Sequence, residues 1–380
     1  MDAFLVTHKR EQTTLMGIPV CEPNEIPEIE NADAGIIVGL GARYRNEVEE
    51  ILKKYKVQHY FLFDEELFKE VEANTQYSIN FQSNKNICVL LYHRVCKLSL
   101  DIWQLAITPE VFEAHIRFFK ENYNILRFED DWDNTETPSL VITFDDGYAD
   151  NYLYALPILE KYQVPATIFV STGNLGTDRE FWWDELERII CLNQHEQFVI
   201  FNDVKYSLSS FDDQINTCRQ IRLQLKQMLP EVRNQCLLEL RNSLGISSMP
   251  RPENRSLTIE ELCHLAQSPY ITIGGHTMTH NMLSAEPEDM QKHEICGSKS
   301  RLEELLQKPV TTFSYPFGTE SDFTDTTANI VKAAGYQKAA TTSCGLVDIN
   351  GNAMYIPRNG VPFYPDAGAV GRHLRKLFYM

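Results

Sequence analysis

Two pairs of side chains in this 380-residue chain have the types and spacing that metal-assisted hydrolysis requires. Asp145 and Asp146 come just after an apolar run at 140–142, and His276 and His280 come just after another at 270–273. Two imidazoles and a carboxylate can hold a divalent ion, which polarises a carbonyl group and lowers the pKa of a bound water to roughly 7. A second carboxylate can then accept the proton of that water. The four residues together predict a hydrolase.

Each pair also has a simpler interpretation. Asp-Asp-Gly is common in turns, and two histidines near a strand end are often structural. Side chains alternate along a strand, so one carboxylate of an adjacent pair can bind metal while the other handles protons. On a helix, His276 and His280 would lie on one face and reach the same ion. Thr277 stands where the H-E-x-x-H motif has its glutamate, which disfavours a metalloprotease of that type.

The elements around these residues predict an α/β fold. Apolar runs indicate buried strands over 87–91, 139–143, 166–170, 270–273 and 311–315, and helical spacing indicates helices that include 109–122 and 149–162. The candidate groups all follow strands, which is typical of a (β/α) barrel, whose sites lie at the carboxyl ends of its strands. Residues 185–260 are charged and rich in Leu and Gln, and they predict a helical insertion with helices around 212–228 and 231–244.

The first 85 residues have a pattern of their own. Strands are predicted at 35–38 and 57–62 and helices at 44–55 and 64–71, which indicates a small Rossmann-like α/β unit before a barrel domain at 86–380. Residues 75–85 are polar and form a candidate linker. The sequence Gly39-Leu40-Gly41 is an incomplete dinucleotide fingerprint, because Tyr44 occupies its last position. A tight turn is the favoured interpretation, and a phosphate or nucleotide-sugar site at the helix N-terminus is the alternative.

Composition and charge narrow the range of partners. The chain is 43% hydrophobic and 11% aromatic, as in ordinary globular proteins. Its net charge of -18 disfavours nucleic acid and anionic membrane surfaces as partners. No apolar run reaches the ~18 residues of a transmembrane segment, and no secretory signal is evident, so we expect a cytoplasmic protein. Nine cysteines without a C-x-x-C pair also favour a reducing compartment.

Three motifs resemble those of the polysaccharide deacetylases (NodB-homology, carbohydrate esterase family 4). Residues 143–147 read T-F-D-D-G, and residues 276–280 read H-T-M-T-H, which fits H-[ST]-x-x-H. The third motif, R-x-P-[YF]-G, appears at 314–318 with Ser314 in place of the arginine. Residues 91–95 and 181–186 add to the resemblance, which covers about 86–365 and omits the N-terminal unit.

The resemblance implies a distorted (β/α) barrel of the NodB-homology type with a divalent metal, zinc first and cobalt or nickel as alternatives. Asp146, His276 and His280 would be the metal ligands, and Asp145 would be the general base. The backbone N–H of Phe317 would stabilise the oxyanion of the reacting amide. Tyr315 and Trp183 are candidate substrate-binding residues. An alternative for Trp183 and its neighbour Trp182 is that they anchor the insertion to the barrel.

Two positions depart from the family pattern. The L-x-x-H motif that supplies the general acid is not visible near the C-terminus, and His93 is the leading candidate to replace it, with a structural histidine as the alternative. Arg358, in the segment 355–361, is expected to take over the role of the arginine missing at 314.

The resulting expectation is metal-dependent N-deacetylation of an amino sugar in a surface polysaccharide or its precursor. One alternative keeps the site and changes the substrate to a formyl group or another C–N amide. A second alternative is a glycan-binding module whose catalytic site has decayed.

Overall fold

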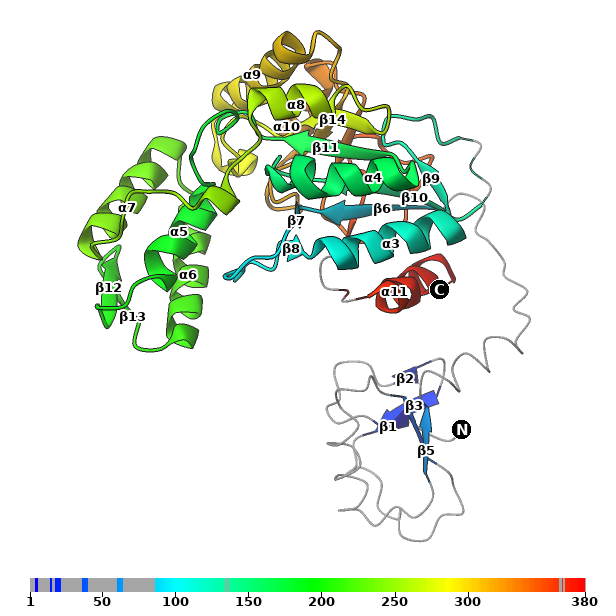
Figure 1. Ribbon diagram of the computed structural model, residues 1–380, viewed down its shortest axis with the longest axis horizontal. Helices are drawn as coiled ribbons and strands as arrows, with labels where there is room; N and C mark the ends of the chain where they lie inside the picture. Colours follow the sequence, from blue (N-terminus) through cyan, green and yellow to red (C-terminus); the bar gives the residue numbers. More distant parts are fainter. Residues whose placement is uncertain are drawn as a thin grey trace. The chain divides into compact units, whose positions relative to one another are not determined.

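A computed structural model describes residues 86–133, 135, 137–361, 364 and 366–379, together with five short strands before residue 64. The chain divides into two units, Met1–Asn80 and Phe81–Met380, and each is described by itself (Figure 1).

The N-terminal unit contains two small sheets. Strands β1 (Phe4–Leu5), β3 (Ile18–Cys21) and β2 (Thr14–Leu15) form one. Strand β4 (Ile36–Gly39) pairs in parallel with β5 (Tyr60–Phe63), as a strand–helix–strand unit requires. The predicted helices at 44–55 and 64–71, the turn at 40–41 and the linker at 75–85 lie outside the described residues, so the Rossmann-like assignment stays a prediction.

The larger unit is built on an eight-stranded sheet whose strands all run parallel. In sheet order, its strands are β17 (Asn359–Gly360), β6 (Ile87–Tyr92), β10 (Ser139–Phe144), β11 (Ala166–Val170), β14 (Ile271–Gly275), β15 (Thr312–Ser314) and β16 (Lys338–Ala340), with β9 (Asn124–Leu126) also beside β10. Strands β6 and β10 are buried along their whole length, which explains their continuous apolar sequences.

The sheet curls so that one segment joins its two edges. In this segment, the backbone N–H of Ile356 donates to the oxygen of Ala339 on β16 (2.9 Å), and the oxygen of Ile356 accepts from Thr341 (2.8 Å). Three residues later β17 pairs with β6 on the other edge. This arrangement confirms the predicted distorted barrel.

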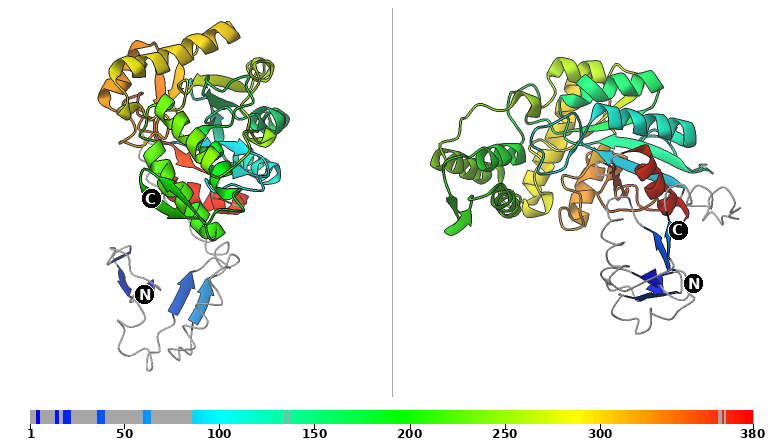
Figure 2. Two further views of the ribbon diagram at one scale, coloured as in Figure 1. Left: turned by 90° about the vertical axis from the view of Figure 1, so that its left-hand side faces the viewer. Right: turned by 60° about the horizontal axis from the view of Figure 1, so that its bottom comes forward.

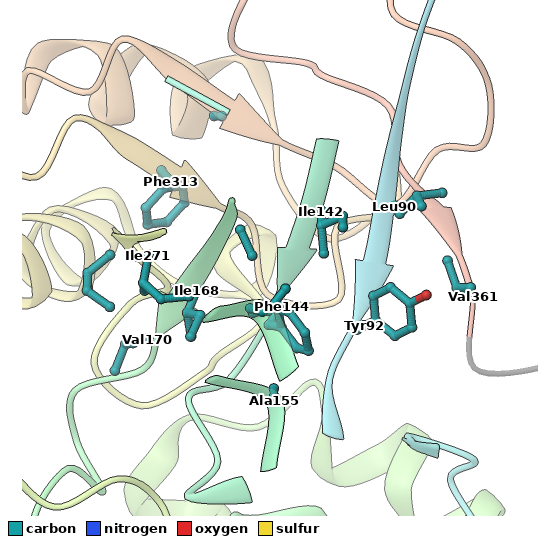
Figure 3. Close-up of a cluster of buried hydrophobic side chains, with 14 of the residues drawn as sticks. Leu90, Tyr92, Ile142, Phe144, Ala155, Ile168, Val170, Ile271, Phe313 and Val361 are labelled. Carbon is teal, nitrogen blue, oxygen red and sulfur yellow. The ribbon is translucent and has the colours of Figure 1, made fainter. Parts of the chain in front are cut away.

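Alternate residues of the strands form two apolar layers. Leu90, Ile142 and Ile168 lie in the cluster that includes Phe313 and Val361 (Figure 3) and also the apolar faces of the flanking helices. The intervening residues, such as Val89 and Val141, form a separate cluster. The helices of this layer are α3 (Pro109–Asn122), α4 (Leu156–Tyr162), α8 (Ile259–Leu265), α9 (Glu288–Leu306), α10 (Asp325–Ala333) and α11 (Ala367–Tyr379).

The insertion has its own apolar core, which differs in part from the prediction. Helices α5 (Trp182–Cys191), α6 (Phe211–Leu225) and α7 (Pro230–Ser243) pack together and lie at one side of the barrel (Figures 1 and 2). The two predicted helices are present as α6 and α7, and the structure adds a hairpin between α5 and α6, formed by β12 (Phe198–Phe201) and β13 (Val204–Ser207). Asn202 and Asp203 at its turn both have positive φ, as a two-residue hairpin turn favours.

Within the part of the chain that the structure describes, no helix is both long and apolar enough to cross a bilayer.

Candidate active site

The candidate residues meet because the carboxyl ends of neighbouring strands share one edge of the barrel. Phe144, the last residue of β10, lies opposite Tyr92, the last residue of β6. Gly275, at the end of β14, lies opposite Val170 of β11. The residues that follow these strand ends therefore converge, and they include His93, Asp145 and His276.

Asp146, His276 and His280 form a buried cluster with the geometry of a metal site. The Nε2 atoms of His276 and His280 lie 3.4 Å and 3.3 Å from Oδ1 of Asp146. Oδ1 of Asp146 and Nε2 of His276 are buried and have no hydrogen-bond partner. The Nδ1 of His276 is 2.7 Å from the backbone oxygen of Ser314, and donation there leaves the Nε2 lone pair free. Two imidazoles and a carboxylate suit zinc, so the residues fit a divalent ion.

The two histidines come from a loop, so the helical placement considered for them was wrong. Asp146, Thr277 and His280 have φ of 76°, 61° and 53°, the left-handed region that non-glycine residues seldom adopt. Such conformations persist where surrounding contacts impose them. Glu294 of α9 holds the two residues between Thr277 and His280, because it accepts hydrogen bonds from the backbone N–H groups of Met278 and Thr279 (2.8 Å each) and from the Thr279 hydroxyl (2.6 Å).

Gly274 and Gly275 belong to β14 itself. A Cβ atom at Gly274 would overlap the ring of Phe169, and one at Gly275 would overlap the hydroxyl of Tyr336. The absence of side chains there lets neighbouring strands and helices approach the strand that leads to His276.

Asp145 is held by Arg358, which reaches it from the segment that closes the barrel. Two guanidinium nitrogens donate to the two carboxylate oxygens, both at 2.7 Å. The Ser314 hydroxyl donates to Asp145 at 3.2 Å and accepts from Arg358 at 2.7 Å. Burial raises the pKa of Asp145, but the charges of Arg358, His276 and His93 together with the hydrogen bonds from Arg358 hold that pKa below its usual value. Asp145 is therefore ionised and fixed in orientation.

His93 lies between β6 and β7 (Arg94–Val95), on the rim of the same cluster. Its backbone oxygen accepts a hydrogen bond from Asn151 (2.9 Å), and its Nδ1 is buried without a partner. Burial raises the pKa of Asp145, and the charges of Arg358, His276 and His93 lower it. The structure thus brings His93 to the two aspartates, and its role as general acid stays a prediction.

The structure corrects the placement of two expected substrate-binding side chains. Tyr315 is fully buried, and its ring stacks on Phe323 at 3.9 Å between centroids, so a sugar cannot reach it. Trp183 is 4% exposed. Its ring stacks on Phe181 at 4.7 Å and meets the ring of His280 at 4.5 Å, so it supports a candidate metal ligand and anchors the insertion.

Phe317 remains at the site. Its ring meets that of His280 edge to face at 4.8 Å, and its φ is 60°. Among the described residues, none accepts a hydrogen bond from its backbone N–H, so this donor is available to a ligand. Its role with an oxyanion stays a prediction.

Two supporting groups escaped the sequence analysis. Glu294 had no local signal, because it is one of several acidic residues on α9. Tyr148 follows the Asp-Asp-Gly motif directly; its hydroxyl donates to Asp184 (2.6 Å) and accepts from Trp183 Nε1 (2.9 Å). Burial raises the pKa of Asp184 to about 8. This chain of contacts fixes the Trp183 ring behind His280.

Comparison with known proteins agrees with the motifs. A family model described as polysaccharide deacetylase matches residues 133–196 and 253–339, which contain both candidate pairs and leave residues 197–252 of the insertion unmatched. The protein YxkH of Bacillus subtilis (strain 168), whose name assigns it to the polysaccharide deacetylases, is 23% identical over 313 residues, which cover 80% of this chain and 82% of YxkH.

Solved structures of deacetylases are also similar to this chain. The Streptococcus pyogenes deacetylase PplD in complex with acetate has 20% identity and a TM-score of 0.49, covering 76% of this chain and 97% of PplD. IcaB from Ammonifex degensii has 18% identity and a TM-score of 0.49, covering 75% of this chain and 96% of IcaB. The family model and the motifs within its matched segments confirm the resemblance to the polysaccharide deacetylases, and the chain is a hydrolase of that kind.

Proposed function

We propose that the protein removes N-acetyl groups from an amino sugar of a surface polysaccharide or its precursor, with zinc, or alternatively cobalt or nickel, as the metal. The observation that carries this proposal is the ionised, buried Asp145 beside the cluster of Asp146, His276 and His280. Oδ2 of Asp145 lies 3.9 Å from Nε2 of His276, so a carboxylate that is not itself a candidate ligand is next to the candidate ligands.

The proposed mechanism gives unequal roles to the two aspartates. A divalent ion, when bound, supplies the Lewis acid that polarises the amide carbonyl and makes water more acidic. Asp145 accepts the proton of the attacking water, and Arg358 and Ser314 hold its oxygens in position for this transfer. Asp146 cannot take this role while its Oδ1 faces both imidazoles.

Two further groups complete the proposed reaction. The N–H of Phe317 donates to the oxyanion that forms when the carbonyl is attacked. His93 protonates the leaving amine, since it is the half-buried histidine beside both aspartates. We also propose a cytoplasmic location, in keeping with nine cysteines that include no C-x-x-C pair.

The test is acetate release from N-acetylhexosamine-containing oligosaccharides by purified, zinc-loaded protein. Asp145→Asn should lower kcat by roughly 10²- to 10⁴-fold, the range of general base catalysis, while zinc content is retained. Asp178→Asn is the matched control, because Asp178 is exposed. Full activity of Asp145→Asn would disprove the base assignment.

The same assay separates the alternatives. Release of formate from N-formyl substrates, without release of acetate from N-acetyl substrates, would assign deformylase activity instead of N-deacetylase activity. Failure to bind any divalent ion after reconstitution would indicate a decayed, glycan-binding site.

A further inference from the structure

Two cations from the insertion lie on the rim of the candidate site. Arg222 and Lys226 are one turn apart at the end of α6, on one face of the chain. Nζ of Lys226 lies 4.3 Å and Cζ of Arg222 lies 5.7 Å from the ring centroid of Phe317. The Phe317 ring in turn meets His280 at 4.8 Å. One aromatic ring therefore separates both cations from a candidate metal ligand.

The two cations differ in how their charge is balanced. Lys226 forms an ion pair with the buried Asp322. The other oxygen of Asp322 accepts from the backbone N–H of Thr319 (3.0 Å) and from its hydroxyl (2.6 Å). Asp322 is therefore the ion-pair partner of Lys226, and its charge acts on Arg222 only from beyond 4.0 Å.

Arg222 is half-buried and rests between two rings. Its Cζ lies 5.1 Å from the ring centroid of Trp103 in addition to its contact with Phe317. Within the described part of the chain, no carboxylate oxygen lies within 4.0 Å of its guanidinium, and no hydrogen-bond acceptor is recorded for it. Burying a cation without a counter-ion is costly, so such a group is a candidate for binding an external anion.

Three other arginines of the same unit show the usual arrangement. Arg94 pairs with Asp150 at 2.9 Å, Arg188 with Glu180 at 2.5 Å, and Arg251 with Glu187 at 2.7 Å. In a chain with a net charge of -18, acidic partners are abundant. Arg233 of α7 is buried and also has no carboxylate partner, but it donates to the backbone oxygen of Thr279 at 3.4 Å. Among the wholly or partly buried arginines that the structure describes, the lack of any recorded acceptor therefore distinguishes Arg222.

We propose that Arg222, assisted by Lys226, binds an anionic group of the substrate, so that the amino sugar carries a phosphoryl or carboxylate group near its N-acetyl group. This inference rests on the proposed deacetylase function and specifies its substrate class. A guanidinium offers two parallel N–H donors to two oxygens of either anion. Phe317 links the two ends of such a substrate, because its N–H is available to the acetyl oxygen and its ring lies beneath the cations.

The experiment compares three compounds that differ in charge. They are methyl N-acetylglucosaminide, N-acetylglucosamine 1-phosphate and N-acetylmuramic acid, which are neutral, phosphorylated and carboxylated. With wild-type protein, kcat/KM should be roughly 10- to 100-fold higher for at least one charged compound, as for a charge-assisted hydrogen bond. In Arg222→Gln the ratio of kcat/KM for the charged compound to kcat/KM for the neutral compound should fall to about one. Arg222→Lys should give an intermediate ratio, because lysine keeps the charge but lacks the two parallel N–H donors of a guanidinium.

Arg219→Gln is the matched control, since Arg219 is exposed on the same helix. It should keep the wild-type ratio. A response of the phosphorylated compound alone assigns a phosphoryl group, and a response of the carboxylated compound alone assigns a carboxylate. Equal kcat/KM for all three compounds in the wild type, or an equal loss in Arg219→Gln and Arg222→Gln, would overturn the proposal.

A binding measurement separates this proposal from the catalytic one. Calorimetric titration of the three compounds into zinc-loaded Asp145→Asn protein needs no turnover. Tighter binding of a charged compound, lost when Arg222→Gln is added, supports the anion site even if no acetate is released by the wild type. Equal affinity for charged and neutral compounds overturns it even if deacetylation occurs.

Discussion

At the scale of single residues, the pair of Asp145 and Arg358 controls the chemistry of the site. Both side chains are almost completely buried, and the guanidinium also donates to the backbone oxygen of Thr341 at 2.9 Å. A buried carboxylate without such a partner would tend to hold its proton, and it could not act as a base. Arg358 thus provides the positive charge beside Asp145 and fixes the orientation of that carboxylate. The uncharged Ser314, which stands at the arginine position of the third motif, cannot provide this charge.

Arg358→Lys should keep the charge but lose the two parallel hydrogen bonds. We expect kcat for acetate release to fall about 10- to 100-fold with zinc content unchanged, because Asp145 loses its fixed orientation. Ser314→Ala is the comparison, since it removes one longer hydrogen bond to the same carboxylate, and it should cost less than Arg358→Lys. A larger loss in Ser314→Ala would contradict the role assigned to Arg358.

At the scale of elements, the loop after β14 depends on helix α9. The two histidines are brought together by left-handed residues, and Glu294 holds three donors of this loop. Helix α5 acts on the same loop from the other side, through the contact of Trp183 with His280. The candidate metal ligands are therefore positioned by two helices that supply no candidate ligand themselves.

Glu294→Gln should weaken metal binding, because an amide accepts with one oxygen where the carboxylate uses two. Supporting residues of this kind contribute roughly 10- to 100-fold to metal affinity, and we expect a loss in that range. Zinc titration against a competing chelator measures it. Glu288→Gln, at an exposed ion pair with Lys292 on the same helix, should leave the affinity unchanged. Equal affinities for Glu294→Gln and the wild type would show that the loop holds its shape without Glu294.

At the scale of the whole molecule, we expect folding to be linked to metal binding and to pH. A ligand that binds the folded chain alone stabilises it by an amount that grows with its concentration. A buried group that changes its pKa on folding makes stability depend on pH in a similar way. Both effects can be measured without a substrate.

Zinc should raise the free energy of unfolding by about 2.7 kcal/mol at one hundred times its dissociation constant. Thermal unfolding with zinc and with a chelator measures this difference. His280→Gln should remove most of it, whereas His264→Gln should not, because His264 is exposed and away from the cluster. A zinc effect of the same size in both variants would place the binding elsewhere.

His115 should make the protein sensitive to acid. Burial lowers the pKa of this imidazole on α3 from 6.5 to about 4. The unfolded chain therefore binds a proton below pH 6.5 that the folded chain does not bind until about pH 4. The resulting stability, roughly 3 kcal/mol, is present above pH 6.5 and is lost as pH falls from 6.5 towards 4.

Denaturant unfolding at several pH values tests this expectation. His115→Phe should lose less stability than the wild type between pH 7 and pH 4.5, and His264→Gln should follow the wild type. Identical pH dependence in His115→Phe and the wild type would mean that other groups account for acid sensitivity.

Much of the fold and part of the candidate site follow from local sequence. Apolar runs predicted β10 and β11 within a residue of their observed ends, and Pro109 with the spacing of Phe112, Ile116 and Phe119 predicted α3. These signals are local, because strand burial and helix caps depend on residues close together in the chain. The hairpin at 198–207 was not predicted, because its strands are only four residues long and lie between long helical segments. The alternation of apolar and polar residues is therefore too short to stand out.

The sequence by itself determined which groups could perform the chemistry: two aspartates after one strand and two histidines after another. Only the tertiary structure decided how those groups are held. It showed that the histidines lie on a loop fastened by Glu294, that Tyr315 and Trp183 are buried, and that Arg222 faces the site without a counter-ion. The pairing of Asp145 with a residue 213 positions away also depends on closure of the barrel. Contacts of that range are set by the packing of whole elements, which no local pattern of residues records.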